Sequence, residues 1–302
     1  MPAFTLFDLI LGSHKKLGTV RFSVSTAGTT NTLVDLAVAS TGATPLTTDA
    51  NKNGTLFVTQ SSGASVPIAG QFRKIQGFNP GTGTWTLSSG LPSSGPNPTF
   101  YGYSTPEFPV ELSVELANDA LRSLGPHVFA DRSIQSSANQ TAYNLSTAFK
   151  HSPPLQVDVM TGVGTSAADP GWITVSDWDY QPSSAGAAAS LIFPKELPSG
   201  RDVRVWYQDF HHRVADSTNV IDERIYPELA VLALVDKMYE YRNSLSRGAT
   251  DYDVGRWKQA QDALAIARAT WPIPSKRRKS KLLILGQETG DHLPWVRPYG
   301  PA

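Results

Sequence analysis

Short segments in which apolar and polar residues alternate recur throughout residues 17–105. Five of them lie between Gly-, Asn- and Pro-rich turns: residues 20–24, 33–36, 55–58, 72–75 and 84–87. Alternation with a period of two buries one face of a strand and exposes the other. The pair Asn53-Gly54 suits a tight connection between two such strands. The pattern therefore predicts a small β-barrel or β-sandwich over residues 17–105.

The N-terminal segment, residues 1–16, follows a different period. Its apolar side chains lie three and four positions apart, which is typical of one helix face: Phe4, Phe7, Ile10 and Leu11. We expect a short amphipathic helix in this segment. It either packs on the core of its own chain or acts as an arm that docks on a neighbouring subunit.

Residues 106–126 carry a second helical pattern. Pro109 suits the start of a helix, and Gly125-Pro126 suits its end. Apolar side chains cover much of the circumference: Val110, Leu112, Val114, Leu116, Ala117, Ala120, Leu121 and Leu124. A helix of this kind is expected to be buried between layers or subunits. It would connect the first β domain to the rest of the chain.

Residues 127–215 return to strand patterns, with Leu155, Val157 and Val159 alternating with polar residues. A long Ser-, Ala- and Gly-rich loop is expected over residues 181–190. The segment predicts a β-sandwich of jelly-roll type. Aromatic side chains are frequent in it: Trp172, Trp178, Tyr180, Trp206 and Tyr207.

Residues 216–271 predict two helices. Pro227 is tolerated only near the start of a helix, so the first helix is expected to hold it in its first turns. Asp222, which precedes it, is expected to cap this helix. Arg247-Gly248 indicates the end of this helix, and Asp251 begins the next. The two helices are expected to form an antiparallel αα-hairpin. The predicted fold class is α+β, with the N-terminal β-barrel or sandwich, a buried helix, the jelly-roll-like sandwich, and this hairpin followed by an extended arm.

Composition narrows the classes of function. The 302 residues include no cysteine, which excludes disulfide scaffolds, thiolate-bound metals and thiol catalysis. Twenty-six basic residues cancel 26 acidic ones, which argues against a generic nucleic-acid binder. No apolar stretch is long enough to span a membrane. Charged residues make up only 17%, which suits a chain whose surface is covered by neighbouring subunits.

No residue pattern of an enzyme stands out. His211 and His212 would point to opposite faces of a strand, so both cannot bind one metal, and we expect solvated imidazoles at a strand end. Asp177 and Asp179 flank Trp178 in a pattern suited to touching a sugar, although a core tryptophan between two solvated aspartates is the simpler explanation. We expect no catalytic residues, no metal and no cofactor.

The proline-rich tail, residues 272–302, is the most polarised segment and is expected to be extended. Five cations within six positions are candidates for contact with DNA or an acidic protein surface: Lys276, Arg277, Arg278, Lys279 and Lys281. A solvated tail is the alternative for this basic run. An apolar run and one tryptophan follow: Leu282, Leu283, Ile284, Leu285 and Trp295. They are expected to form an arm that docks on a partner, with the apolar run adding a strand to the partner's sheet; the alternative is packing back on their own chain.

Three stretches resemble parts of the neck proteins of tailed bacteriophages, which are the head-to-tail connectors or adaptors beneath the portal ring. QGFNPGTGTWTL at residues 76–87 resembles the strand-turn-strand that precedes the first helix of such proteins, and VELANDALRSL at 114–124 resembles that helix. The hairpin that begins at Tyr226, with the basic tail, resembles their C-terminal hairpin and arm. The sandwich at 127–215 departs from a minimal all-helical adaptor, so a tail terminator or another neck component is an alternative.

This resemblance implies a non-enzymatic structural protein of the virion, assembled in the host bacterial cytoplasm. Its copies would form a ring, typically dodecameric in such proteins, that joins the capsid to the tail and surrounds the DNA channel. The implied partners are the portal protein, a tail or tail-terminator protein, further copies of the chain and, without sequence specificity, genomic DNA. The helices of the ring would pack through six side chains: Val114, Leu121, Leu229, Leu232, Tyr239 and Leu264. A carbohydrate- or receptor-binding virion module is the alternative that the aromatic residues of 127–215 favour.

Overall fold

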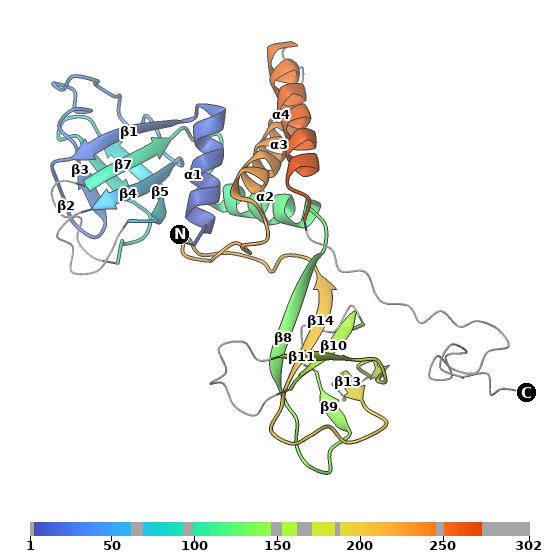
Figure 1. The fold of residues 1–302 in the computed structure, drawn as a ribbon. Helices are drawn as coiled ribbons and strands as arrows, with labels where there is room; N and C mark the ends of the chain where they lie inside the picture. The colour runs from blue at the N-terminus through green and yellow to red at the C-terminus, as the bar shows by residue number, and fades with distance from the viewer. Residues whose placement is uncertain are drawn as a thin grey trace, which may run out of the picture. The chain divides into compact units, whose positions relative to one another are not determined.

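The computed structural model describes residues 3–61, 69–92, 99–145, 153–161, 171–184, 188–245 and 251–273. They form two compact units, which are drawn in Figure 1. Unit 1 contains the described residues up to His127 and those from Phe210 onward, and unit 2 contains those within Val128–Asp209. Four helices and antiparallel sheets in the described part of the chain confirm the predicted α+β class.

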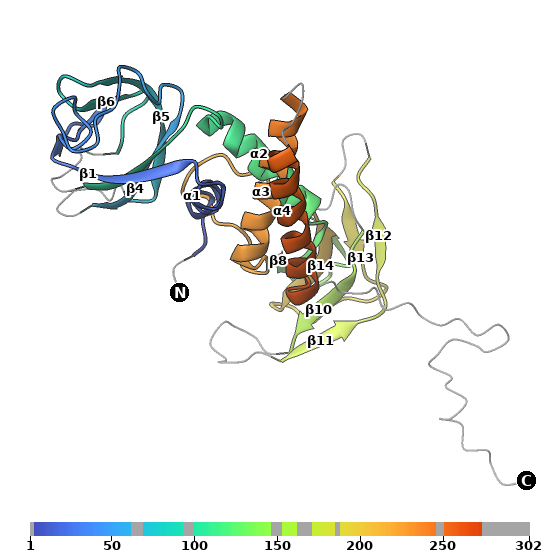
Figure 2. The same cartoon turned by 90° about the horizontal axis from the view of Figure 1, so that it is seen from above.

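The β part of unit 1 is an antiparallel sheet with the strand order β1-β7-β4-β5-β6-β3-β2. Its strands are β1 (Val20–Ser25), β2 (Ala27–Gly28), β3 (Thr32–Val34), β4 (Thr55–Ser61), β5 (Gln71–Asn79), β6 (Thr84–Leu87) and β7 (Thr99–Ser104). Figure 2 shows that the strands of this sheet curve rather than lie flat. β1 and β2 are its end strands, separated in the chain by Thr26 alone, and the described strands form no closed barrel.

The inner face of this sheet is packed with large side chains, because alternate residues of each strand point there. Trp85, Tyr101, Leu56 and Ile75 are fully buried. A chain of hydrogen bonds crosses this core: Trp85 Nε1 donates to the Tyr101 hydroxyl at 2.9 Å, which donates to Asp35 Oδ2 at 2.7 Å. Burial, together with the Asp35 carboxylate, raises the pKa of Tyr101. The phenol therefore stays protonated and remains a donor to Asp35.

Four helices complete unit 1: α1 (Leu6–Leu17), α2 (Val110–Ser123), α3 (Pro227–Leu245) and α4 (Asp251–Thr270). α3 packs against each of the other three, and most of its residues from Leu229 to Tyr239 are buried. A helix that is covered on several sides must be apolar around most of its circumference. The run of apolar residues at the start of α3 meets this requirement.

The N-terminal helix α1 packs on the core of its own chain, which is the first of the two alternatives for this segment. Leu6, Leu9 and Ile10 are fully buried. Thr5 precedes the helix and forms a reciprocal cap with Asp8, in which each side chain accepts the other residue's backbone N–H. Gly18 ends the helix with a φ of 71°, a left-handed conformation that glycine adopts without strain.

The prediction that Asp222 caps the first helix of the hairpin is wrong. α3 begins at Pro227, which lacks a backbone N–H and suits the first helical position. Asp222 instead lies in the preceding turn, where its Oδ1 accepts a hydrogen bond from the Arg224 N–H at 2.9 Å. Its carboxylate therefore shapes the approach to the helix rather than the helix end.

Unit 2 consists of two antiparallel sheets with the strand orders β11-β10-β14-β8 and β12-β13-β9. Their strands are β8 (His127–Gln135), β9 (Ala142–Asn144), β10 (Gln156–Met160), β11 (Trp172–Val175), β12 (Asp179–Gln181), β13 (Ser190–Ile192) and β14 (Asp202–Asp209). Side chains from both sheets share one core, in which Val157 and Val205 pack with Leu191 and Tyr143. The two sheets thus contribute side chains to one apolar layer.

We predict that the stability of unit 1 falls as the pH is lowered because of His14. This side chain is buried, with its ring 5.3 Å from that of Phe57 and its Nδ1 2.7 Å from Thr19 Oγ1. Burial lowers the pKa of His14 from 6.5 to about 4. The unfolded chain therefore binds more protons between these two values, and about 3 kcal/mol of stability should be lost as the pH falls through this range.

Urea unfolding at pH 7 and pH 4.5, followed by circular dichroism, measures this effect. His14→Leu should show a smaller difference in unfolding free energy between the two pH values than the unchanged chain does. His212→Gln, which alters an exposed imidazole, is the matched control and should keep the full difference. Equal pH dependence in His14→Leu and the unchanged chain would contradict the prediction.

Candidate functional site

The outer face of the four-stranded sheet in unit 2 gathers polar and aromatic side chains. The register places Asp158 of β10 opposite both Thr174 of β11 and Arg204 of β14, and it places Gln156 opposite Trp206. The alternate residues of the same strands, such as Val157 and Val205, lie in the core. The alternation that builds the core thus also brings these polar groups together on the other face.

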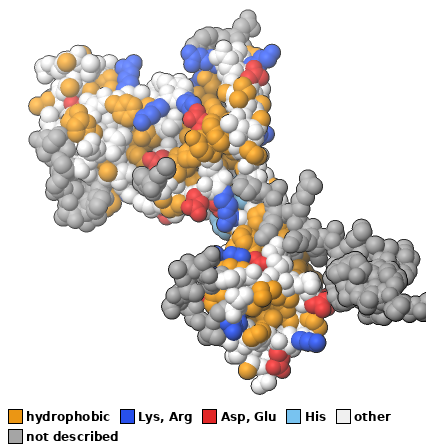
Figure 3. Space-filling model, in the orientation of Figure 1, with side chains coloured by type: hydrophobic (Ala, Val, Ile, Leu, Met, Phe, Trp, Pro, Cys, Tyr) orange, Lys and Arg blue, Asp and Glu red, His pale blue; other side chains and the backbone are white. Residues whose placement is uncertain are grey.

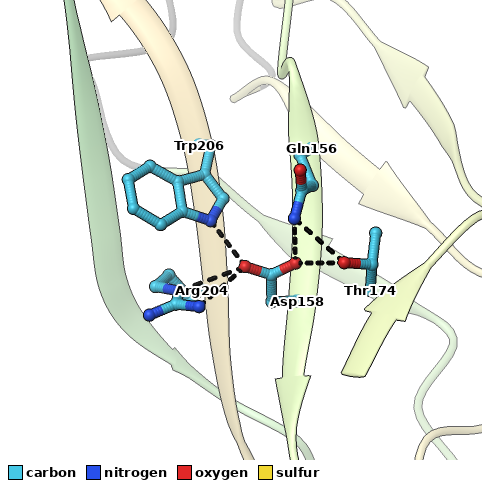
Figure 4. Close-up of polar contacts among 5 residues, drawn as sticks. All are labelled: Gln156, Asp158, Thr174, Arg204 and Trp206. Atoms are coloured by element: carbon cyan, nitrogen blue, oxygen red, sulfur yellow. Dashed lines mark hydrogen bonds and ion pairs between the residues drawn. The ribbon is translucent and has the colours of Figure 1, made fainter. Parts of the chain in front are cut away.

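Asp158 is the centre of this group, as Figure 4 shows. Its Oδ2 accepts hydrogen bonds from Arg204 Nη2 at 2.9 Å, Arg204 Nε at 3.2 Å and Trp206 Nε1 at 2.6 Å. Its Oδ1 accepts one from the Thr174 hydroxyl at 2.9 Å and another from the Gln156 amide. The side chain is only 3% exposed, so these donors replace the water that a carboxylate normally binds.

The same contacts keep Asp158 ionised. Burial by itself would raise the pKa of this carboxyl group, because it disfavours the charged form. The hydrogen bonds from Gln156, Trp206, Arg204 and Thr174 outweigh burial, and the pKa of Asp158 lies below its ordinary value. The ion pair with Arg204 is therefore complete at neutral pH.

Two arginines converge on the tryptophans of this face. The Arg204 guanidinium carbon lies 4.2 Å from the ring centroid of Trp172 and 4.8 Å from that of Trp206. The guanidinium carbon of Arg132, an exposed residue of β8, lies 5.6 Å from the Trp172 centroid. Distances within about 6 Å allow an attraction between the cation and the ring. Two positive charges thus share one indole, and within this group Asp158 balances only one of them.

This arrangement is suited to binding rather than to a bond-breaking step. The only carboxylate in the group is held ionised by its donors, so it stays an acceptor. The group contains no histidine, and its one hydroxyl, that of Thr174, is a donor to this carboxylate. Within the described ranges, no cluster of three or more histidine, aspartate or glutamate side chains has the geometry of a metal site.

The sequence predicted the aromatic content of this unit but not how it is divided between the two faces of the sheet. Trp178, Tyr180 and Tyr207 pack on the core. Trp172 and Trp206 lie with Arg204 on the outer face. Sequence reasoning missed Asp158 and Arg204, although the alternation of Gln156 to Asp158 and of Arg204 to Trp206 was a signal for an outward polar face.

The expectation that both adjacent histidines are solvated is wrong for His211. β14 ends at Asp209, so neither histidine lies on a regular strand. His211 is buried, and its Nε2 accepts a hydrogen bond from the Asp222 N–H at 3.1 Å. Burial lowers the pKa of His211. His212 is exposed, as expected.

The side chains predicted to pack the helices of a ring lie in the core of unit 1. Val114 is partly buried and packs against this core. The other five are buried in it: Leu121, Leu229, Leu232, Tyr239 and Leu264. Their own chain covers them, so a neighbouring copy would have to contact other residues. The predicted arm and basic run, which comprise Leu282, Leu283, Ile284, Leu285, Trp295, Lys276, Arg277, Arg278, Lys279 and Lys281, lie outside the described residues.

Unit 1 carries a group of exposed apolar side chains on its end strand. Phe22 and Val24 of β1 are 51% and 39% exposed, and Phe100 of β7 is 42% exposed. Val24 is paired with Phe100 and Phe22 with Gly102, so the three side chains lie on one face of the strand pair. We call these three residues the β1–β7 patch.

Comparisons with known proteins add no relative: no protein family matches the sequence, and no characterised protein is recognisably similar to it. None of the helices in the described ranges combines the length and apolarity needed to cross a bilayer.

We predict that Asp158→Asn destabilises unit 2 by about 3 kcal/mol, because Arg204 loses the only carboxylate that balances it in a largely buried site. Thermal and urea unfolding, followed through the near-ultraviolet signal of the tryptophans, measures the loss. Asp179→Asn removes an equivalent charge from an exposed position of the same unit and should change stability by less than about 0.5 kcal/mol. Similar stability of both variants would show that the Asp158 network contributes little.

Proposed function

We propose that this chain is a non-enzymatic structural protein of the bacteriophage neck. In this proposal its copies form a ring beneath the portal, join the capsid to the tail and surround the DNA channel. The proposed partners are the portal, a tail or tail-terminator protein, further copies of the chain and genomic DNA, and the proposed location is the virion. The observation that carries it is the β1–β7 patch, together with the sequence resemblance to head-to-tail connectors.

The β1–β7 patch supports repeated contact between copies. Three apolar side chains next to one another on the end strand β1 and its neighbour β7 are costly to leave in water, at about 25 cal/mol for each Å². β1 pairs with β7 on one side, and no further strand of the described residues pairs with it on the other. An edge of this kind accepts contact with another chain. A ring made of identical contacts would cover such an edge on every copy.

The outer side of α4 supports the same proposal. Its apolar residues divide into a buried stripe that includes Ala260, Leu264 and Ala267, and exposed Val254 and Ile266. α4 therefore packs through its buried stripe and leaves two separate apolar side chains, Val254 and Ile266, exposed. Side chains of this second kind suit a helix that meets a neighbouring subunit.

The proposal extends to a finer architecture. It comprises a barrel or sandwich at residues 17–105, a jelly-roll sandwich at 127–215, a hairpin at 216–271 and a docking arm at 272–302. The curved antiparallel sheet of unit 1 supports the first, in a form that is not a closed barrel, and two sheets around a common core support the second. The low content of charged residues supports the proposal that the protein functions within a permanent assembly.

We predict that Phe22→Gln combined with Val24→Gln weakens self-association at least about tenfold, because two large apolar side chains no longer lose contact with water on assembly. Light scattering after size-exclusion chromatography and class averages of the purified chain measure the assembly. Leu36→Gln, which replaces an exposed apolar residue outside the patch, should assemble normally. A chain that stays monomeric at all concentrations, or is absent from purified virions, would argue against a ring.

We predict that deletion of residues 276–302 abolishes docking on the portal and leaves the fold unchanged. The physical reason is the loss of the basic run and of the apolar run that follows it. Co-purification with the portal protein measures docking, and circular dichroism measures the fold. Normal docking of the shortened chain would rule out the arm as the contact.

A further inference from the structure

We infer that the outer face of the four-stranded sheet in unit 2 binds a sugar that carries a carboxylate. The site consists of Arg132, Trp172, Arg204 and Trp206, held in place by Asp158. It is a function additional to the proposed role in the neck and does not depend on it. The chemical class of the ligand follows from the charge, rigidity and aromatic content of the face.

The charge of the face selects an anion. Arg132 and Arg204 both lie within 6 Å of the Trp172 ring, whereas Asp158 contacts only Arg204. Arg204 uses Nε and Nη2 for Asp158, and its Nη1 and the whole guanidinium of Arg132 form no hydrogen bond within the described part of the chain. An anion placed between these groups would gain charge-assisted hydrogen bonds, and a guanidinium matches the two oxygens of a carboxylate.

The rigidity of the face lowers the cost of binding. Five hydrogen bonds to Asp158 come from Arg204, Trp206, Thr174 and Gln156, and they fix the guanidinium and the indole before a ligand arrives. Long side chains otherwise lose conformational freedom when they bind. Asp158 is therefore a positioning residue, since its own oxygens are already occupied.

The aromatic side chains favour a sugar as the carrier of the carboxylate. Trp172 and Trp206 are partly exposed on this face. The Arg204 guanidinium lies over both rings, so a ligand would pack on the part of each indole that Arg204 leaves uncovered. A sugar ring has an apolar C–H surface that packs on an indole and a polar edge that reaches the arginines. The face supplies both kinds of contact within the span of a single sugar unit.

Single-stranded nucleic acid is the other ligand class that combines anions with rings. Its binding sites follow the backbone with a row of cations and stack successive bases. This face presents two arginines, and one of them is paired with Asp158. Two cations, one already neutralised, suit one carboxylate better than a series of phosphates.

The test uses the full chain and an array of oligosaccharides that carry glucuronate, galacturonate or sialate, together with their neutral counterparts. The carboxylate-bearing sugar that is retained best is then titrated calorimetrically, beside its neutral counterpart and an oligothymidylate. We expect saturable binding of the acidic sugar, weaker binding at high salt, and at least about tenfold weaker binding of the neutral sugar. Retention of no acidic sugar, equal binding of the neutral one, or binding of oligothymidylate alone would overturn the inference.

The variants separate the site from the rest of the surface. Arg132→Gln alters an exposed side chain outside the Asp158 network and should weaken binding at least about tenfold without changing the unfolding temperature. Trp172→Leu should also weaken binding. Lys195→Gln removes one exposed positive charge elsewhere in unit 2 and should bind as the unchanged chain does. Unchanged binding by both Arg132→Gln and Trp172→Leu would place the ligand elsewhere and refute the proposed site.

Discussion

The β-sheet structure of each unit depends on one carboxylate that is almost completely removed from water. Asp35 in unit 1 and Asp158 in unit 2 are both buried. A buried carboxylate is costly unless donors surround it, so the strands must bring those donors to fixed positions. Asp35 accepts from the Tyr101 hydroxyl, the Ser23 hydroxyl and the Ala37 N–H. These requirements favour a single register, since a shift by one residue would leave the charge without partners.

The two carboxylates have different consequences, because they lie on different faces of their sheets. Asp35 bonds to Tyr101, whose hydroxyl also accepts from Trp85 inside the core, so its network stabilises the interior. Asp158 is covered by the side chains of its own outer face, and its network holds an arginine and a tryptophan near solvent. Figure 3 shows that hydrophobic and charged side chains both reach the surface of the chain. A rigid polar network on such a surface suits recognition, whereas one in the core supplies only stability.

The sequence predicted the elements of this fold well where the spacing of apolar residues alone determines the secondary structure. The helices at Leu6–Leu17, Val110–Ser123 and Asp251–Thr270 follow the spacing of their apolar residues. The sequence did not predict contacts that depend on how strands pair across the sheet. Asp158 meets Thr174 and Arg204 only through the register of three strands. It also failed for Asp222 and His211, since two segments outside regular strands and helices bring them together. The six apolar side chains expected at subunit contacts show a further limit, because periodicity identifies a buried face but not which chain buries it.

That last distinction bears on how an assembly would be built from this chain. A side chain buried in its own unit contributes to folding whether or not a neighbour is present, so it cannot make assembly depend on concentration. The side chains that can do so are those still exposed in one chain, and among the described residues they include the β1–β7 patch and two residues of α4, Val254 and Ile266. Both belong to unit 1, whereas the outer face of the four-stranded sheet in unit 2 is polar and aromatic and Ile173 is an exposed apolar residue of that unit. Assembly through the β1–β7 patch would therefore use residues other than those that form the outer face of unit 2.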